Sequence, residues 1–451
     1  MQENFLLKAD TAIKLYESVK DLPIIDYHNH LSLVDIANNK RFFDIYELWI
    51  QPDPYKHRAM RTCGVAEEYI TGNATSEEKF IKWWETLPKL ILNPLSHWSA
   101  MELQTIFGIT EPLNGQNAQK IYQRCNEYLA KNPVTVNSLL ELFQVEYACP
   151  CSSLIDDMQV YSQIACLSPS LRGDDMLLPT QDFLSVLATQ TGNAITALSD
   201  YEQAIERRLD AFAKIGCRFT DHALDNGFTY YKDDGNNAER FLRHINGKAN
   251  AEEQARLASY LLMRLGSLYA KRGFVMQLHI GAERYTSSSL RKKAGATGGF
   301  AGIGNSVNAR ALTELLDEID SSKYGLPKTM LFTLNPADNA LISVLSGSYA
   351  KDGVAGLITQ GPAWWWCDHK FGMQEMLENT ATFSTLSNFV GMTTDSRSLL
   401  SFVRHDYFRR VLCSWLAEKW ENGEILCNFE ALQDLAVQLS YQNAKAAIIG
   451  E

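Results

Sequence analysis

The chain lacks the features that mark membrane proteins and nucleic-acid-binding proteins. It has no run of 18 apolar residues, so we expect no transmembrane helix and no membrane partner. It has no run of lysine or arginine, and its 53 acidic residues outnumber its 42 basic ones, which gives a formal net charge of −11. Because a phosphate backbone is bound by clustered cations, we also expect no nucleic-acid partner.

A disulfide framework is also missing. The nine cysteines are odd in number and scattered, and no Cys-x-x-Cys pair occurs. Such usage is typical of reduced thiols, and no basic segment followed by an apolar stretch opens the sequence, so we expect a cytoplasmic protein. Cys149 and Cys151 could in principle bind metal, but the pattern favours two packed thiols.

What the chain has is a repeated alternation of short apolar runs and amphipathic stretches. The stretches 200–216 and 251–273 carry apolar residues at intervals of three and four, which predicts helices. Continuous apolar runs separated by helices predict parallel strands that are buried on both faces. The eight candidate strands are 22–26, 145–149, 164–169, 217–222, 274–281, 329–335, 355–362 and 389–395.

The order of these elements predicts the fold class. Eight strands, most followed by a helix, predict a (β/α)8 barrel of the TIM type, with a doubly wound open sheet as the alternative. Residues 31–141 hold several helical patterns and no convincing strand, so we expect a helical insertion after the first strand. We divide the chain into 1–34 (an N-terminal helix and the first strand), 35–140 (the insertion) and 141–451 (the rest of the barrel with C-terminal helices).

Two histidines at the end of the first strand are the strongest local signal. His28 and His30 are two residues apart, so in an extended chain both point to the same side and can reach one cation. Alone this pattern fits structural histidines equally well, but a strand end is where a barrel holds its site. Asp395 ends the eighth strand, which neighbours the first in a closed barrel. Together, the two histidines and Asp395 predict a site for one divalent metal ion, with zinc favoured and manganese or iron as alternatives.

Arginines near strand ends indicate the substrate. Arg172, Arg284 and Arg397 each follow a strand, and a guanidinium pairs through two hydrogen bonds with a carboxylate or a phosphate. No glycine-rich phosphate loop occurs, so a carboxylate is the better prediction. Trp364 could wall the cleft or stack on a sugar face, with helix packing as the alternative. Further polar residues at the strand ends are Asp221, His222 and His279.

Longer segments match one family pattern nearly from end to end. They read DYHNHLS at 26–32, RFFDIYELW at 41–49, CRFTDHAL at 217–224, MQLHIGAER at 276–284, LPKTMLFTLNPADN at 326–339, WWWCDHKFGM at 364–373 and FVGMTTDSRSLLSFVRHDYFRRVLC at 389–413. With these segments the chain resembles the uronate isomerase family (glucuronate and galacturonate isomerases) of the amidohydrolase superfamily.

This resemblance implies a fold, a reaction and a set of roles. The fold is a distorted (β/α)8 barrel with a helical insertion. The reaction interconverts a hexuronate and its keto form, such as D-glucuronate and D-fructuronate or D-galacturonate and D-tagaturonate, by proton transfer through a cis-enediol. For this reaction we assign Asp395 as the base, with Tyr55 or a metal-bound hydroxide as the alternatives, and Tyr55 and His279 are candidates for moving protons. The implied metal ligands are His28, His30 and Asp395, and the implied substrate contacts are Tyr55, Arg172, His279 and Arg397.

Three departures from the family pattern leave the substrate and the turnover open. Pro54 stands where the family often has histidine, residues 150–154 read PCSSL instead of TTDDP, and residues 285–287 replace an asparagine-rich run. One alternative is a mononuclear metal-dependent hydrolase of the same superfamily that acts on a sugar-acid derivative. Another is a binding protein that has lost turnover. We expect a small-molecule sugar acid as the partner and, from the apolar insertion, a homo-oligomer.

Overall fold

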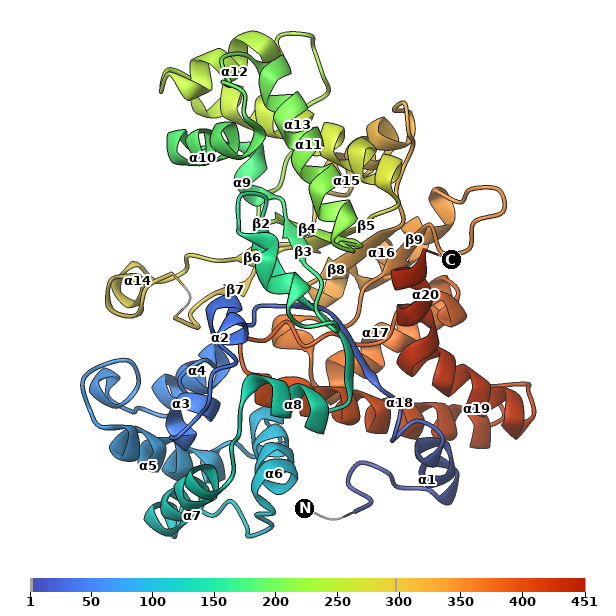
Figure 1. The fold of residues 1–451 in the computed structure, drawn as a ribbon. Coiled ribbons are helices and arrows are strands. Elements are labelled where there is room, and N and C mark those ends of the chain that lie inside the picture. The colour runs from blue at the N-terminus through green and yellow to red at the C-terminus, as the bar shows by residue number, and fades with distance from the viewer. Residues whose placement is uncertain (1–2, 297, 451) are drawn as a thin grey trace.

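A seven-stranded parallel sheet forms the centre of the molecule, with helices around it (Figure 1). The computed structural model describes residues 3–296 and 298–450. The strand order follows the chain without reversal, as in a barrel and unlike a doubly wound sheet, so the predicted distorted (β/α)8 barrel is confirmed. The strands are, in order, β1 (Ile24–Asn29), β2 (Val145–Ser153), β3 (Ser170–Arg172), β4 (Phe219–Leu224), β5 (Val275–Ile280), β8 (Thr329–Thr333) and β9 (Ile358–Gln360).

The eighth predicted strand, 389–395, is an irregular extended segment beside β1. The N–H of Asp395 donates to the carbonyl of His28 at 3.1 Å. The N–H of His28 donates to the side-chain oxygen of Thr393 at 2.9 Å, where a regular ladder would offer a carbonyl. Asp395 has a φ of +46°, in the left-handed region, and this conformation interrupts a strand. The distortion of the barrel therefore lies where the first and eighth segments meet.

The third predicted strand is displaced along the chain. The prediction placed it at 164–169, whereas β3 is Ser170–Arg172. The end of β2, residues 151–153, pairs with β3, and the preceding segment makes only an isolated bridge between Ala148 and Leu167. The prediction was wrong because Leu167 and its apolar neighbours pack into the core without forming a ladder.

Local capping signals explain where the long helices begin and end. Both predicted long helices are present, as α11 (Leu198–Lys214) and α13 (Ala251–Arg272). Asn250 and Glu253 form a capping box at the start of α13, and Gly273 ends it with a φ of +66°. The other helices after β2 are α9 (Asp174–Leu177), α10 (Gln181–Thr191), α12 (Asn237–Ile245), α14 (Ser288–Ala294), α15 (Ala309–Asp320), α16 (Asn339–Ser348), α17 (Lys370–Phe383), α18 (Val403–Glu421), α19 (Phe429–Val437) and α20 (Asn443–Ile449).

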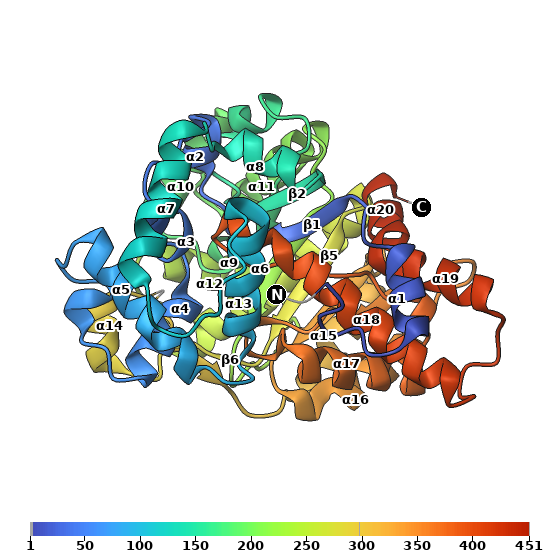
Figure 2. The ribbon, with the colours of Figure 1, turned by 90° about the horizontal axis from the view of Figure 1, so that it is seen from below.

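The chain between β1 and β2 is helical, as predicted for the insertion. Its helix α6 (Pro94–Phe107) packs on α18, and α18 also packs on the N-terminal helix α1 (Asp10–Glu17) (Figure 2). Trp49, Trp83, Trp84 and Trp98 of the insertion are buried in a core cluster that includes residues of α1 and α18. The three-part division of the chain stays a prediction. The insertion helices are α2 (Leu33–Ala37), α3 (Ile45–Trp49), α4 (Pro54–Thr62), α5 (Ser76–Thr86), α6 (Pro94–Phe107), α7 (Ala118–Lys131) and α8 (Val136–Leu142).

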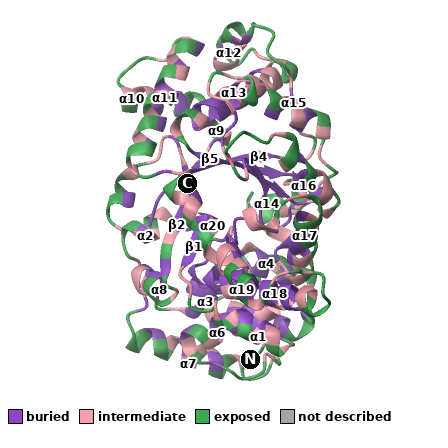
Figure 3. Cartoon of the chain, turned by 90° about the vertical axis from the view of Figure 1, so that its right-hand side faces the viewer, coloured by how far each residue is buried: buried purple, intermediate pink, exposed green. Residues whose placement is uncertain are grey.

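The pattern of buried and exposed residues follows this arrangement of a central sheet with helices around it. Buried residues run along the strands and the facing sides of the helices, and exposed residues cover the outer faces (Figure 3). A short antiparallel pair, β6 (Ala282–Glu283) and β7 (Gly302–Ile303), follows β5. Within the described ranges, no helix combines the length and the apolar character that a membrane crossing needs.

Candidate active site

A cavity of about 450 Å³ opens at the carboxyl ends of the strands. This is the end at which barrels of this type hold their sites, because the loops that follow the strands meet there. The structure brings all nine site residues predicted from the sequence to the wall of this one cavity. They are His28, His30, Tyr55, Arg172, His279, Arg284, Trp364, Asp395 and Arg397.

Asp26 holds the first and eighth segments together beneath the cavity. This buried carboxylate accepts hydrogen bonds from the N–H of Thr394 at 2.6 Å and from its hydroxyl at 2.8 Å. It also lies 3.2 Å from Nε2 of His405 on α18. Burial alone would raise the pKa of Asp26, but its bonds to His405 and Thr394 outweigh that cost and leave the pKa below the usual range. An ionised Asp26 therefore sets the position of Asp395, one residue beyond Thr394.

Asp395 faces both His28, on β1, and His30, directly after it. Its Oδ1 lies 3.2 Å from Nε2 of His28 and 3.0 Å from Nε2 of His30. Its Oδ2 accepts a hydrogen bond from Nε1 of Trp364 at 2.7 Å. Burial would raise the pKa of the Asp395 carboxyl, but the hydrogen bonds and the charges of the two histidines hold it well below its usual value. The carboxylate is therefore ionised across the physiological range.

The residues around His28 fit a divalent metal ion. Nitrogen and oxygen ligands about 2.0–2.1 Å from a tetrahedral zinc ion lie about 3.3 Å apart, close to the separations from Asp395 to the two histidines. Two groups of potential ligand atoms, each within 4.8 Å of one another, share His28: one adds His30 and Cys151, the other adds Asp221 and His279. In the described part of the chain, Oδ1 of Asp221 and Nε2 of His279 are buried without a hydrogen-bond partner.

His279, on β5, is enclosed by aromatic rings. Its ring centroid lies 4.5 Å from those of His28 and Phe332 and 4.8 Å from that of Trp364. Burial and the neighbouring charge of His28 lower the pKa of His279 well below its usual value, so its imidazole is neutral. A neutral imidazole with an unpaired nitrogen at a cavity wall can give or take one proton through a hydrogen bond.

Tyr55 reaches the cavity from the first turn of α4. Asp53 caps this helix by accepting the N–H of Tyr55 at 2.9 Å, and Pro54 occupies the first helical position, where its missing N–H costs nothing. The family departure at Pro54 is thus compatible with the local fold. Burial raises the pKa of Tyr55 well above its usual value, so the phenol stays protonated.

The buried carboxyl of Asp368 lies beside the Tyr55 hydroxyl. The Tyr55 hydroxyl donates to Oδ2 of Asp368 at 3.4 Å, and Nη1 of Arg404 donates to the same oxygen at 3.2 Å. Burial raises the pKa of Asp368 to about 7. The sequence reasoning did not single out Asp368 and Arg404, although both lie within segments that carry the family resemblance.

The three predicted arginines differ in their partners. Nη2 of Arg172 lies 2.8 Å from Asp174, and Nε of Arg284 lies 2.8 Å from Asp225. Arg397 is exposed at the cavity wall and has neither a hydrogen bond nor an ion pair within the described residues. Among the three arginines, it is therefore the one with all of its guanidinium donors available to an anionic ligand, whereas Arg284 is paired through Nε alone.

Two residues that line the cavity were not given a place in the site by the sequence reasoning. Cys151 was predicted to be a packed thiol, and this is wrong, because it lines the cavity, whereas Cys149 is packed in the core below it. Asp221 was noticed at a strand end without a role, and its Oδ2 lies 3.7 Å from the Cys151 sulfur and 3.5 Å from Nη1 of Arg172. The two-residue repeat of a strand was a usable signal, since it places Cys149 and Cys151 on one face.

The fold and the cavity define a (β/α)8-barrel enzyme with histidines and carboxylates converging at the carboxyl ends of its strands. The family model described as glucuronate isomerase matches residues 1–447. A uronate isomerase of Caldanaerobacter subterraneus subsp. tengcongensis is 38% identical over 459 residues, covering 99% of this chain and 98% of that protein. A uronate isomerase of Clostridium perfringens is 36% identical over 457 residues, covering 98% of each.

A solved structure agrees with these sequence relatives. The crystal structure of a uronate isomerase from Thermotoga maritima superposes with a TM-score of 0.92 at 30% identity, covering 99% of both chains. The chain belongs to the glucuronate isomerase family, and it is an isomerase. The predicted resemblance is confirmed, and the alternative of a metal-dependent hydrolase is not favoured by these relatives.

Proposed function

We propose that the protein interconverts a hexuronate and its keto form, D-glucuronate with D-fructuronate or D-galacturonate with D-tagaturonate, through a cis-enediol. The observation that carries this proposal is the guanidinium of Arg397, which has no partner in the described part of the chain and lies in the same cavity as Asp395 and the two histidines. A free guanidinium binds a carboxylate through two hydrogen bonds, and a cavity of about 450 Å³ is of the size that encloses a small ligand. The relatives carry the name uronate isomerase.

Arginines would fix the orientation of the open-chain sugar. Arg397 would bind the carboxylate of the uronate, and Arg172, which lines the same cavity, would support it. Arg284 and Trp364 would complete the walls around the sugar hydroxyls. These contacts would hold the reacting carbons C1 and C2 in line with the groups that transfer protons.

We propose that His28, His30 and Asp395 hold one divalent ion, most suitably zinc. When bound, the ion would act as a Lewis acid that polarises the oxygens at C1 and C2 of the sugar. Asp221 and His279 line the same cavity, and each has a buried polar atom without a partner among the described residues, which is the polar environment that a bound cation and a hydroxylated substrate require.

The proton transfers would then be shared among three side chains. Asp395 would take the proton from C2 and return it to C1, and neutral His279 would carry the hydroxyl proton from O2 to O1. Protonated Tyr55 would donate a hydrogen bond to the oxygen that gains negative charge. The low pKa of Asp395 makes it a weak base, so the acidity of the C2 proton must be raised by charge stabilisation at both oxygens.

A direct assay tests this proposal. Zinc-loaded protein is incubated with D-glucuronate or D-galacturonate labelled with deuterium at C2, and the ketose is followed by the circular dichroism of its carbonyl. Ketose formation with loss or transfer of the label supports isomerisation through an enediol. Calorimetric binding of both sugars without any ketose would overturn the proposal in favour of a binding protein, and hydrolysis of a sugar lactone would favour the hydrolase.

We further propose that the enzyme works in the cytoplasm and forms a homo-oligomer. All nine cysteines are free thiols, which suits a reducing compartment. Exposed apolar side chains on the insertion, such as Ile91 and Leu92, offer surface for self-association. Light scattering coupled to size-exclusion chromatography measures the oligomeric state, and a monomer at micromolar concentration would contradict the second part of the proposal.

A further inference from the structure

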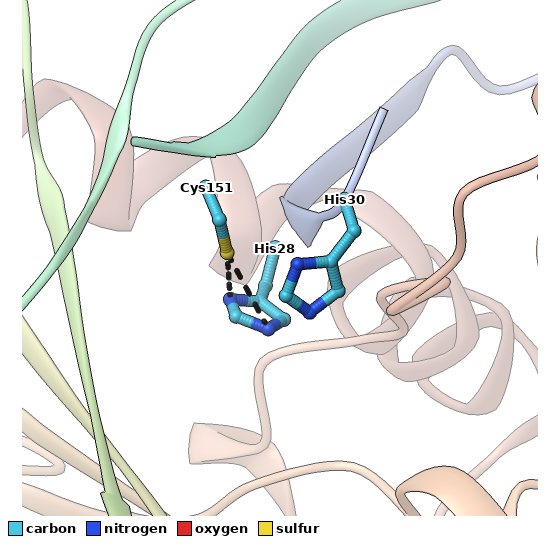
Figure 4. A group of neighbouring side chains, drawn as sticks. All are labelled: His28, His30 and Cys151. Atoms are coloured by element: carbon cyan, nitrogen blue, oxygen red, sulfur yellow. Dashed lines mark hydrogen bonds between the residues drawn. The ribbon is translucent and has the colours of Figure 1, made fainter. Parts of the chain in front are cut away.

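The Cys151 thiol lies in the candidate metal site. Its sulfur is 3.7 Å from Nδ1 and 3.9 Å from Nε2 of His28 (Figure 4). Cys151 extends from β2 and His28 from the neighbouring strand β1, and His30 directly follows the end of β1, so the three side chains meet at one place. Their ligand atoms all lie within 4.8 Å of one another.

These distances are close to the separations between ligand atoms of one zinc ion. A thiolate about 2.3 Å and an imidazole nitrogen about 2.0–2.1 Å from a tetrahedral zinc ion lie about 3.6 Å apart. The separations between Cys151 and His28 are within a few tenths of an ångström of this value. Small rotations of the two side chains would bring sulfur and nitrogen into one coordination sphere.

Two unpartnered polar atoms point to a cation at the same place. Asp221 is 1% exposed and His279 is 4% exposed, yet Oδ1 of the first and Nε2 of the second have no partner among the described residues. A buried carboxylate oxygen left unpaired is costly unless a cation or a ligand completes its environment. Asp221 also contacts the Cys151 sulfur through its other oxygen, at 3.7 Å.

We propose that Cys151 is a direct thiolate ligand of the metal ion that His28 and His30 bind. This inference rests on the metal site of the proposed function and deepens it. On binding, the S–H bond of Cys151 breaks, a sulfur–metal bond forms, and the proton passes to solvent. No electron is transferred and no further reactant is needed.

A sulfur ligand changes which metals the site prefers. Thiolates favour zinc, cobalt and cadmium, whereas magnesium and manganese prefer oxygen ligands. The site should therefore discriminate against manganese more strongly than one built from histidine and carboxylate alone. Segment 150–154, where the chain departs from the family pattern, would then be a specificity feature of this metal site.

Spectroscopy of the cobalt-loaded protein tests the proposal without relying on turnover. The wild type, Cys151→Ser and Cys166→Ser are loaded with one equivalent of cobalt(II); Cys166 is another half-buried free thiol and serves as the matched control. We expect an intense near-ultraviolet thiolate-to-cobalt band in the wild type and in Cys166→Ser, and no such band in Cys151→Ser. X-ray absorption of the zinc form should show a sulfur shell at about 2.3 Å that only Cys151→Ser lacks.

Metal affinity and thiol protection give independent readouts. Loss of a residue that hydrogen-bonds to a metal ligand typically weakens metal binding by about 10–100-fold. Cys151→Ser removes a direct ligand, so zinc binding should weaken by at least this factor, and manganese binding should weaken less. Cys151→Asp, which supplies an oxygen ligand, should restore metal binding without the sulfur band and shows whether the site still folds. Zinc should also protect Cys151 from iodoacetamide, while half-buried Cys63 and Cys427 remain as reactive as in the metal-free protein.

The outcomes separate this inference from the proposed function. A wild type that holds one cobalt ion without a sulfur band, or a band that survives in Cys151→Ser, overturns the thiolate ligand and leaves the isomerase proposal untouched. A wild type that binds no metal overturns both the ligand and the metal site. A sulfur-bound metal in a protein that isomerises no uronate supports the ligand and overturns the proposed function.

Discussion

Nε1 of Trp364 donates a hydrogen bond of 2.7 Å to Oδ2 of Asp395, while Oδ1 of the same carboxylate faces His28 and His30. The indole thus fixes the rotation of the carboxylate so that only one oxygen faces the two imidazoles. Trp364 also packs 4.8 Å from the ring centroid of His279. One side chain therefore positions both an ionised carboxylate and a neutral imidazole.

Replacing Trp364 by phenylalanine should slow turnover. A hydrogen bond to a charged group contributes about 1.5–3 kcal/mol, so kcat should fall by about tenfold to a hundredfold, with a smaller change in KM. Trp420→Phe is the matched control, since it removes an indole bond to the Cys427 carbonyl far from the cavity and should keep normal kinetics. Equal kcat values for wild type and Trp364→Phe would show that this bond does not position Asp395.

Replacing Arg397 by lysine should lower kcat/KM strongly, although the substitution keeps the positive charge. Lysine offers a point charge and cannot form two parallel hydrogen bonds with a carboxylate, so kcat/KM should fall by about tenfold to a hundredfold. Arg310→Lys, on an arginine that is 87% exposed on α15, is the control and should leave kcat/KM unchanged. Near-wild-type kinetics of Arg397→Lys would rule out two-point binding of the substrate carboxylate.

Asp368 should make stability fall as the pH rises from about 4 to 7. Burial raises its pKa in the folded state to about 7 from an ordinary 3.8, so its contribution is fully present below pH 3.8 and is lost as the pH rises through 7. Relative to Asp368→Asn, the wild type should lose at most about 4 kcal/mol across this window. Urea unfolding of both proteins at several pH values measures the difference, and parallel stability curves would contradict the raised pKa.

His57, in α4, should produce the opposite dependence on pH. Its Nε2 is buried without a partner among the described residues, and burial lowers its pKa to about 4. Because the folded pKa lies below the unfolded value of 6.5, its contribution is present above pH 6.5 and is lost as the pH falls through 4. His57→Gln should therefore gain about 3 kcal/mol relative to the wild type between pH 7.5 and pH 4, measured by urea unfolding. A constant difference across this range would show that folding leaves the pKa of His57 unchanged.

Much of the fold could be predicted because its signals are local. The capping box at Asn250 and the glycine at 273 mark the ends of α13 within a few residues of sequence. The strand error at 164–169 arose because apolar side chains report burial, whereas a strand also requires a partner with free hydrogen-bonding groups. That partner, the end of β2, could not be read from the sequence of the segment itself.

The candidate site could be predicted where its residues follow strand ends. His28 and His30 stand two residues apart after one apolar run, and a barrel brings all strand ends to one face, so their meeting with Asp395 could be expected. Residues that reach the site from elsewhere gave no such signal. Asp368 is 313 residues from Tyr55 in the chain, and only the packing of α4 against the segment before α17 places their side chains together.

The amino-acid sequence by itself determined the barrel, the helices and the set of polar groups carried to its carboxyl end, because alternation, capping and strand-end placement depend on neighbouring residues. The tertiary structure alone decided which of those groups touch. It placed the Cys151 sulfur beside His28, 123 residues away, and paired Arg172 and Arg284 with carboxylates, while Arg397 has no partner among the residues that the structure describes. Charge, ionisation and metal ligation depend on separations of a few ångströms, and the closure of the sheet sets these separations.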